Sequence, residues 1–120
     1  MEKIAVIAGL AALAQDTRLD IFRLLVQAGK DGRPVGPIAE KLGLPSATLS
    51  FHLNQLKHAG LVTFRREGRS LIYSVNFAAM NGLMTFLTEN CCGGNVSGCE
   101  IMPVACDASS RTKIKKRAGA

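Results

Sequence analysis

Several features are missing from this chain of 120 residues, and each absence excludes a class of protein. No stretch reaches the ~18 apolar residues that a membrane-spanning helix needs. Only Glu2 and Lys3 precede the apolar segment 4–14, so the basic start of a secretory signal peptide is missing. An enzyme is disfavoured because there is no Cys-x-x-Cys motif and no phosphate-binding loop, and both histidines lie in one short segment. We therefore expect a cytoplasmic binding protein that needs no membrane and no organic cofactor.

The chain does contain enough apolar sequence for one small domain, together with a cluster of cysteines. Apolar residues make up 48% of the sequence, which excludes general disorder, and a core of this size gains from dimerisation. The apolar segment 4–14 is expected to be a helix that pairs with another chain. Three of the four cysteines fall within a stretch of nine residues. We expect a folded part over 1–90, a cysteine-rich segment over 91–107, and a basic, disordered tail over 108–120.

The net charge of +6 is concentrated in two places. Residues 1–40 carry equal numbers of basic and acidic side chains, whereas 41–70 carry five basic and one acidic. Residues 111–120 add five basic side chains, and the segment 71–110 is acidic. A local basic surface suits contacts with nucleic-acid phosphates, and a solvated charged face is the alternative. The terminal basic run is open to the same two interpretations.

The periodicity of apolar residues predicts the order of helices and strands. Two helices, Val35–Leu42 and 45–59, follow one another across a glycine and form a helix-turn-helix pattern. Two β-rich segments, 61–67 and Ser70–Val75, are joined across Gly68 as a hairpin. The expected fold class is therefore mainly α with a small β-hairpin, a dimeric winged helix-turn-helix. Further expectations are a helix over 18–28 capped by Asp16 or Thr17, a loop over 29–34, and a last helix over 77–90 with Met80, Leu83, Met84 and Leu87 on one stripe.

The helix predicted over 45–59 has an apolar and a polar side. Leu49, Leu53 and Leu56 share the side that must face the core. Small and hydroxylic residues on the other side let a helix enter the major groove of DNA and bond to base edges. The candidates for DNA contact on and beside this side are Ser46, Ala47, Ser50, Phe51, Asn54 and Lys57, and the candidates for phosphate contact at the hairpin tip are Arg65, Arg66 and Arg69.

Two residues of this helix each allow two interpretations. Phe51 is an aromatic residue on a polar side, which fits apolar contact with thymine methyl groups. Packing under the hairpin explains Phe51 equally well. His52 lies nearer the core side, where a structural role is favoured over a DNA contact.

Four segments between residues 14 and 75 form a specific set, namely Asp16-Thr17-Arg18-Leu19, Ile38-Ala39-Glu40-Lys41-Leu42-Gly43, Thr48-Leu49-Ser50-Phe51-His52-Leu53 and Ala59-Gly60-Leu61-Val62. Together they resemble the ArsR/SmtB family of dimeric winged-helix repressors, which leave their operator DNA when a metal or metalloid binds. The resemblance implies that the first and last helices form the dimer interface. It also implies that Thr48, Ser50 and His52 occupy DNA-reading positions, while Phe51 departs from the histidine that is commoner there.

Neither familiar ligand site of that family can exist in this chain. The helix Val35–Leu42 lacks the cysteine pair of many arsenic sensors, and 77–90 lacks the His and Asp of the zinc sensors. The segment Glu89-Asn90-Cys91-Cys92, followed by Cys99, is similar to a subgroup of arsenic repressors whose thiol site lies beyond the last helix. The resemblance therefore implies an arsenic(III)-responsive repressor with Cys91, Cys92 and Cys99 as ligands.

The chemistry of the cysteines fits such a site and leaves others open. Thiolates select soft acceptors, and trivalent arsenic, or antimony, is satisfied by three of them. Neighbours in a continuing helix point ~100° apart, so the helix should end near Cys91, and Gly93-Gly94 lets the chain turn back. Cys106 is a fourth candidate ligand, for instance in a zinc or cadmium site, although zinc sites usually have spaced cysteine pairs. Other interpretations are a two-thiolate site for an organoarsenical, a soft divalent metal, and a disulfide switch in a redox-sensing repressor.

Overall fold

A computed structural model describes residues 1–94, so the expectations for Cys99, Cys106 and the basic tail lie outside the described residues. The chain divides into two compact units, Met1–Leu87 and Thr88–Ala120. The first unit carries the predicted helices and the hairpin. The second is described only over its first seven residues, 88–94.

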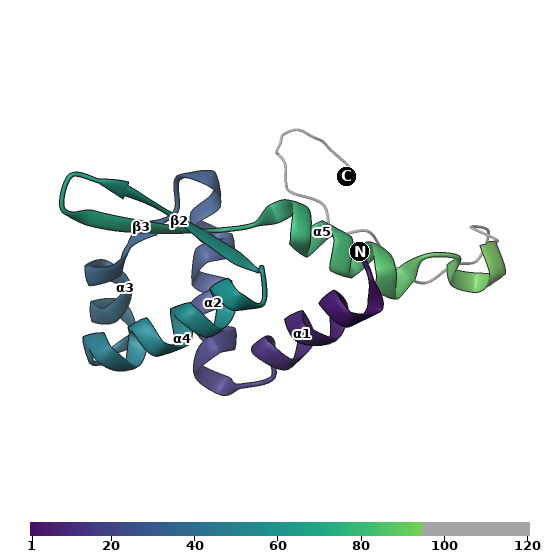
Figure 1. Ribbon diagram of the computed structural model, residues 1–120, viewed down its shortest axis with the longest axis horizontal. Coiled ribbons are helices and arrows are strands. Elements are labelled where there is room, and N and C mark those ends of the chain that lie inside the picture. The colour runs from purple at the N-terminus through teal and green to yellow at the C-terminus, as the bar shows by residue number, and fades with distance from the viewer. Residues whose placement is uncertain (95–120) are drawn as a thin grey trace, which may run out of the picture. The chain divides into compact units, whose positions relative to one another are not determined.

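The described residues form helices and strands in the predicted order (Figure 1). The predicted fold class, mainly α with a small β-hairpin, is confirmed. Figure 1 shows the tip of the hairpin, which is the wing, at the same end of the first unit as α3 and the start of α4. The α-helices are α1 (Lys3–Leu13), α2 (Asp16–Ala28), α3 (Val35–Leu42), α4 (Ser46–His58) and α5 (Phe77–Thr88), the short 3-10 helices are η1 (Gly29–Asp31) and η2 (Cys91–Gly94), and the strands are β1 (Arg33–Pro34), β2 (Val62–Glu67) and β3 (Ser70–Val75).

The predicted hairpin is present, and the sheet has one strand more than predicted. β2 and β3 pair antiparallel with Glu67 opposite Ser70, so the turn consists of Gly68 and Arg69. The loop expected over 29–34 is wrong, because it contains η1 and the short strand β1, which pairs with the other edge of β3. Gly32 makes this pairing possible: its φ is +71°, and a side chain there would collide with the carbonyl group of Tyr73.

Two helix ends were predicted correctly and one helix start was not. α3 ends at Gly43, whose φ of +65° is the left-handed conformation that glycine adopts easily. α4 is followed by Gly60 with φ +79°. α2 begins at Asp16, and its cap is Gln15, whose Oε1 accepts a hydrogen bond from the Arg18 N–H at 2.8 Å. The expected cap at Asp16 or Thr17 is therefore wrong, because Gln15 is the last extended residue and the helix starts directly after it.

The core lies between α2, α3, α4 and the base of the wing. Leu49, Leu53 and Leu56 of α4 have no exposed surface, which confirms the predicted core side of this helix. Apolar burial of this kind stabilises by roughly 25 cal/mol per Å² of buried surface. The fully buried partners of these leucines are Ile21, Leu25, Ile38, Leu61 and Val62.

The outer helices α1 and α5 are attached to this core by small contacts. Gly9 of α1 lies against Leu83 of α5, and a Cβ at Gly9 would be 3.1 Å from its Cδ1 atom. Asn76 precedes α5 and holds it at both ends of its side chain: Oδ1 accepts from the Ala79 N–H at 3.2 Å, and Nδ2 donates to the Gly60 carbonyl at 3.1 Å. Within residues 1–94, no helix is long and apolar enough to cross a membrane.

Candidate nucleic-acid interface and thiol segment

α4 presents a polar surface on the side away from its leucines. Pro45 lies just before the helix in an extended conformation, and the first turn contains no acidic residue. The N-terminal end of a helix carries a partial positive charge, which suits an approach to DNA phosphates. The predicted contact residues that are exposed on this surface are Ser46, Ala47, Thr48, Ser50, Phe51 and Asn54.

Phe51 is the largest apolar side chain on this surface. It is 56% exposed, and its ring contacts the neighbouring His52 ring edge-on at a centroid distance of 5.3 Å. The buried aromatic residue of the wing is Tyr73, and the 45% exposed Phe64 lies against its ring at a centroid distance of 5.6 Å. Phe51 therefore does not pack under the wing, and contact with thymine methyl groups stays a prediction.

His52 is placed differently from the other predicted contact residues. Its side chain is buried, and Nδ1 lies 3.1 Å from Nη1 of Arg18. Burial first, and then the positive charge of Arg18, lower the pKa of His52 below its ordinary value. The burial of His52 beside Arg18 agrees with the structural role that its core-side position favoured, and the DNA-reading role that the resemblance implied for it stays a prediction.

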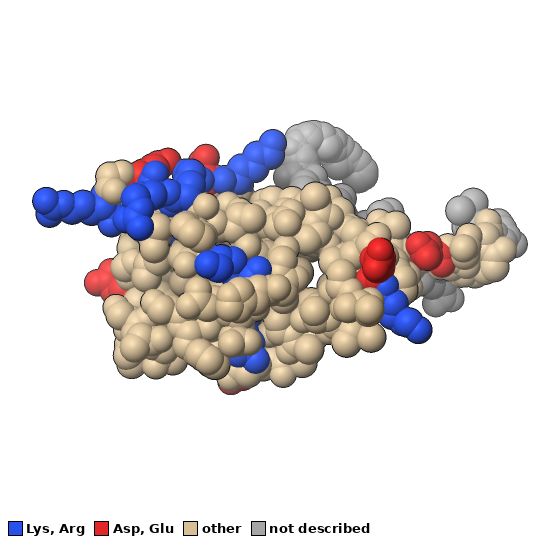
Figure 2. All heavy atoms as spheres, viewed as in Figure 1, with Lys and Arg blue, Asp and Glu red and all other residues tan. Residues whose placement is uncertain are grey.

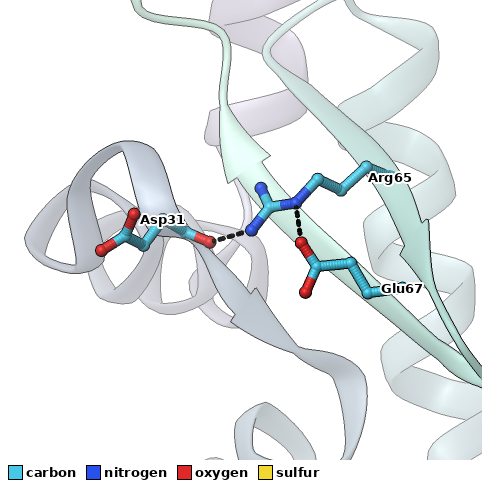
Figure 3. A network of polar contacts seen from close by, with 3 residues as sticks. All are labelled: Asp31, Arg65 and Glu67. Atoms are coloured by element: carbon cyan, nitrogen blue, oxygen red, sulfur yellow. Dashed lines mark hydrogen bonds and ion pairs between the residues drawn. The ribbon is translucent and has the colours of Figure 1, made fainter.

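The three arginines of the wing have different surroundings. Arg65 is drawn back toward the body of the protein, because Nε bonds to Oε2 of Glu67 at 2.7 Å and Nη2 donates to the Asp31 carbonyl at 3.0 Å (Figure 3). Arg66 and Arg69 are exposed near the turn. Figure 2 shows Lys and Arg side chains gathered along the wing. The predicted basic wing is therefore present, with Arg65 joining it to η1.

Lys57 has a role that the sequence did not indicate. Its Nζ lies over the ring of Phe64 in β2, 4.9 Å from the centroid, and the side chain is half-buried. Such a cation–π contact joins the last turn of α4 to the base of the wing. No spacing in the sequence links residues 57 and 64, because the contact depends on how α4 packs on the sheet.

Two residues, Glu89 and Asn90, separate the end of α5 from the first cysteine of the thiol segment. The helix ends at Thr88 rather than at the expected Asn90, which confirms that it stops before the cysteine pair. Asn90 and Cys92 have φ of 58° and 56°, a left-handed conformation that interrupts helical spacing. Cys91 is half-buried, and Cys92 is an exposed free thiol. Within residues 1–94, no three His, Cys, Asp or Glu side chains are grouped to hold a metal, and Cys99 and Cys106 lie outside that range.

The helix pair α3–α4, the polar surface of α4 and the basic wing define a winged helix-turn-helix DNA-binding protein. A family model described as a helix-turn-helix domain matches residues 13–64. The chain belongs to the ArsR/SmtB family of winged-helix transcriptional regulators.

Named relatives agree with this family. The nodulation protein NolR of Rhizobium meliloti is 35% identical over 80 residues, which cover 67% of this chain and 63% of that protein. The solution structure of the homodimeric winged helix-turn-helix domain Mb0332 from Mycobacterium bovis, a possible ArsR-family regulator, has a TM-score of 0.57 and 32% identity. That match covers 77% of this chain and 85% of Mb0332.

A third similar protein is described as a possible transcriptional regulator for arsenical resistance. Its crystal structure has a TM-score of 0.58 and 28% identity, covering 66% of this chain and 79% of that one. Relatives and structural neighbours are transcriptional regulators rather than enzymes, which confirms the expectation that this chain is not an enzyme. The chain spans less than two thirds of the length of the first curated relatives that it matches.

Proposed function

We propose that this chain is an arsenic(III)-responsive transcriptional repressor of the cytoplasm. It binds operator DNA as a homodimer and leaves the DNA when cysteine thiolates bind trivalent arsenic or antimony. The observation that carries the proposal is the position of Cys91 and Cys92, directly after the last helix of a winged helix-turn-helix.

The DNA-binding part is supported by the surface of α4 and the wing. A helix with small and hydroxylic residues at its start, an exposed Phe51 and a wing carrying Arg66 and Arg69 suits a major groove flanked by phosphates. Dimerisation is supported by the exposed Ile4 and Ile7 of α1, and by the homodimeric state of Mb0332.

The metalloid part is supported by the chemistry of the donor set. Thiolates are the ligands that a soft, thiophilic centre selects. The left-handed conformations of Asn90 and Cys92 release the two neighbouring thiols from helical spacing. Cys92 is exposed, and Gly93 and Gly94, both with positive φ, follow it and let the chain turn back, so that Cys99 would supply a third thiolate. The similarity to a possible transcriptional regulator for arsenical resistance also supports arsenic as the ligand.

Release would follow from a change in the placement of the two reading heads, each of which consists of α3, α4 and the wing of one chain. A dimer must present its two α4 helices at the spacing of the operator half-sites. Thiol ligation next to the end of α5 can alter that spacing if α5 contributes to the dimer interface. A coupling of about 1–3 kcal/mol between the two sites is typical of such switches.

An alternative function is redox sensing by the same fold, because neighbouring thiols are readily oxidised and Cys92 is exposed. A sensor of organoarsenicals that uses two thiolates is a second alternative. These functions share the DNA-binding surface and differ only in what reacts with the cysteines.

The test is fluorescence anisotropy of the reduced full chain on a duplex from the promoter region upstream of its own gene. Arsenite, phenylarsine oxide and diamide are added in separate titrations. Release at an arsenite concentration roughly equal to that of the protein supports the proposal, because thiolates bind this soft centre tightly. Release by diamide alone supports a redox sensor, and release by the organoarsenical alone supports the second alternative.

Cysteine variants locate the response. Cys91→Ser, Cys92→Ser and Cys99→Ser should each bind the duplex like the parent and no longer respond to arsenite. Cys106→Ser is the matched control and decides whether the fourth thiol takes part. A full arsenite response in the first three variants contradicts the ligand assignment, and absence of DNA binding by the parent contradicts the repressor itself.

A further inference from the structure

Arg18 joins the end of α1 to the middle of α4. Its side chain starts in the first turn of α2, and its Nε donates to the Ala12 carbonyl at 2.7 Å. Its Nη1 donates to Nδ1 of His52 at 3.1 Å. One guanidinium group therefore connects three helices at a partly buried place.

Both partners of Arg18 need what it supplies. Ala12 lies in the last turn of α1, where carbonyl groups lack a partner within the helix and the helix end is partially negative. His52 is buried, and a buried ring nitrogen without a partner is costly. A guanidinium can only donate, so Nδ1 of His52 accepts and the proton of the neutral ring is on Nε2. The link thus fixes the ring as well as the helix.

The fixed ring lies next to the DNA-reading surface. The ring of His52 contacts the exposed ring of Phe51 edge-on, with the two centroids 5.3 Å apart. The two residues are neighbours in α4, so a rotation of α4 that breaks the bond to Arg18 also turns Phe51. The orientation of the reading surface therefore depends on a contact that α4 makes through the residue next to Phe51.

We propose that Arg18 is a positioning residue for DNA binding, which holds the reading helix α4 at a fixed place on the end of α1 through His52 and Ala12. Because α1 also carries the exposed apolar residues Ile4 and Ile7, this link joins the proposed dimer helix to the reading helix of the same chain. The inference rests on the proposed function in so far as its main readout is operator affinity.

The first test changes the donor. The reduced full chain is titrated onto the promoter duplex, well below its unfolding temperature. Arg18→Met removes both bonds and should raise Kd at least tenfold, a change of ~1.4 kcal/mol. Arg18→Lys keeps the charge and should also weaken binding, because an ammonium lacks the planar fork that reaches both acceptors.

A matched pair of variants changes the acceptor. His52→Asn places a carbonyl oxygen near the position of Nδ1 and keeps an acceptor, whereas His52→Leu has none. We expect His52→Asn to bind the duplex within about threefold of the parent, and His52→Leu at least ~10-fold more weakly. Combining Arg18→Met with His52→Leu should weaken binding no further than the larger single change, because both remove the same bond.

Two measurements separate positioning from simple structural support. Urea unfolding of each variant gives its stability, and a variant that is less stable but binds the duplex with the parent's Kd would overturn the inference. Long-range ¹⁵N NMR should find the His52 proton on Nε2 in the parent and a mixture of tautomers in Arg18→Met. A parent proton on Nδ1 would overturn the bond itself. If the parent binds no operator duplex, the proposed function fails first and the inference falls with it.

Discussion

α4 and α1 use apolar residues in opposite ways. In α4, Leu49 and Leu53 are fully buried and the outer side is polar. In α1, Ile4 is 79% exposed and Ile7 is 58% exposed, although the helix contains hardly any polar residue. A helix that is apolar all round is normally covered on all sides. The difference indicates that α4 buries its apolar side within one chain, whereas α1 exposes apolar residues that the proposed dimer would cover.

The first prediction tests the completeness of the reading head and has the largest expected effect. Leu53→Ala leaves a cavity beneath α4 and should lower the free energy of unfolding by roughly 2–5 kcal/mol. Urea unfolding followed by circular dichroism measures the change. The control is Asn54→Ala, at the next residue of α4, whose side chain is exposed. It should change the free energy of unfolding by less than about 0.5 kcal/mol. Equal effects of the two substitutions would contradict the burial of Leu53.

The second prediction tests the incompleteness of α1. Ile7→Glu places a charge on a surface that is exposed in one chain and covered in the proposed dimer. The dimer dissociation constant should rise at least tenfold, ~1.4 kcal/mol, with the monomer still folded. Sedimentation velocity over a concentration series measures the dissociation constant. Phe51→Ser, an apolar-to-polar change on the reading surface, is the control that should leave it unchanged. An unaltered dimer in Ile7→Glu would show that this side of α1 does not carry the interface.

The parts of the fold that local sequence determines were predictable. α3, α4 and the hairpin follow from apolar spacing and from glycines at Gly43, Gly60 and Gly68, each with positive φ. Missed features depend on residues far apart in the chain. β1 forms because residues 33–34 reach β3, and a pair of residues has no periodicity to recognise.

The same distinction applies to the site. The exposed residues of α4 follow from helical spacing, so Ser50 and Asn54 were placed correctly on the outer side. The bonds of His52 to Arg18, and of Arg65 to Asp31, each join residues 34 positions apart. Such pairs depend on tertiary packing, so no local sequence pattern predicts them.

The third prediction concerns the connection between the two regions. Asn76 caps the start of α5 and bonds to the Gly60 carbonyl, so it attaches an outer helix to the reading head. Asn76→Ala should lower the free energy of unfolding by about 1 kcal/mol, the usual effect of losing a helix cap. Asn81→Ala, an exposed position within α5, is the matched control for removing an asparagine. Equal unfolding midpoints for parent and Asn76→Ala would show that α5 is held without this cap.

The last and smallest effect is a pH dependence that originates at the contact between Arg18 and His52. Burial and the Arg18 charge lower the pKa of His52 below the ordinary value of 6.5. Between these two pKa values the unfolded chain binds more protons than the folded chain, so acid favours unfolding. The stability that the neutral ring contributes is fully present above pH 6.5 and is lost progressively as the pH falls toward the lowered pKa.

His52→Asn isolates this contribution, because asparagine keeps an acceptor for Arg18 and does not titrate. Urea unfolding of parent and variant across this pH range should show the parent losing stability relative to His52→Asn as the solution becomes acidic. A difference that does not change with pH would mean that the ring of His52 accepts a proton in the folded protein as readily as in the unfolded chain. Arg18 would then not hold Nδ1, and the reading head would owe its orientation to apolar packing alone.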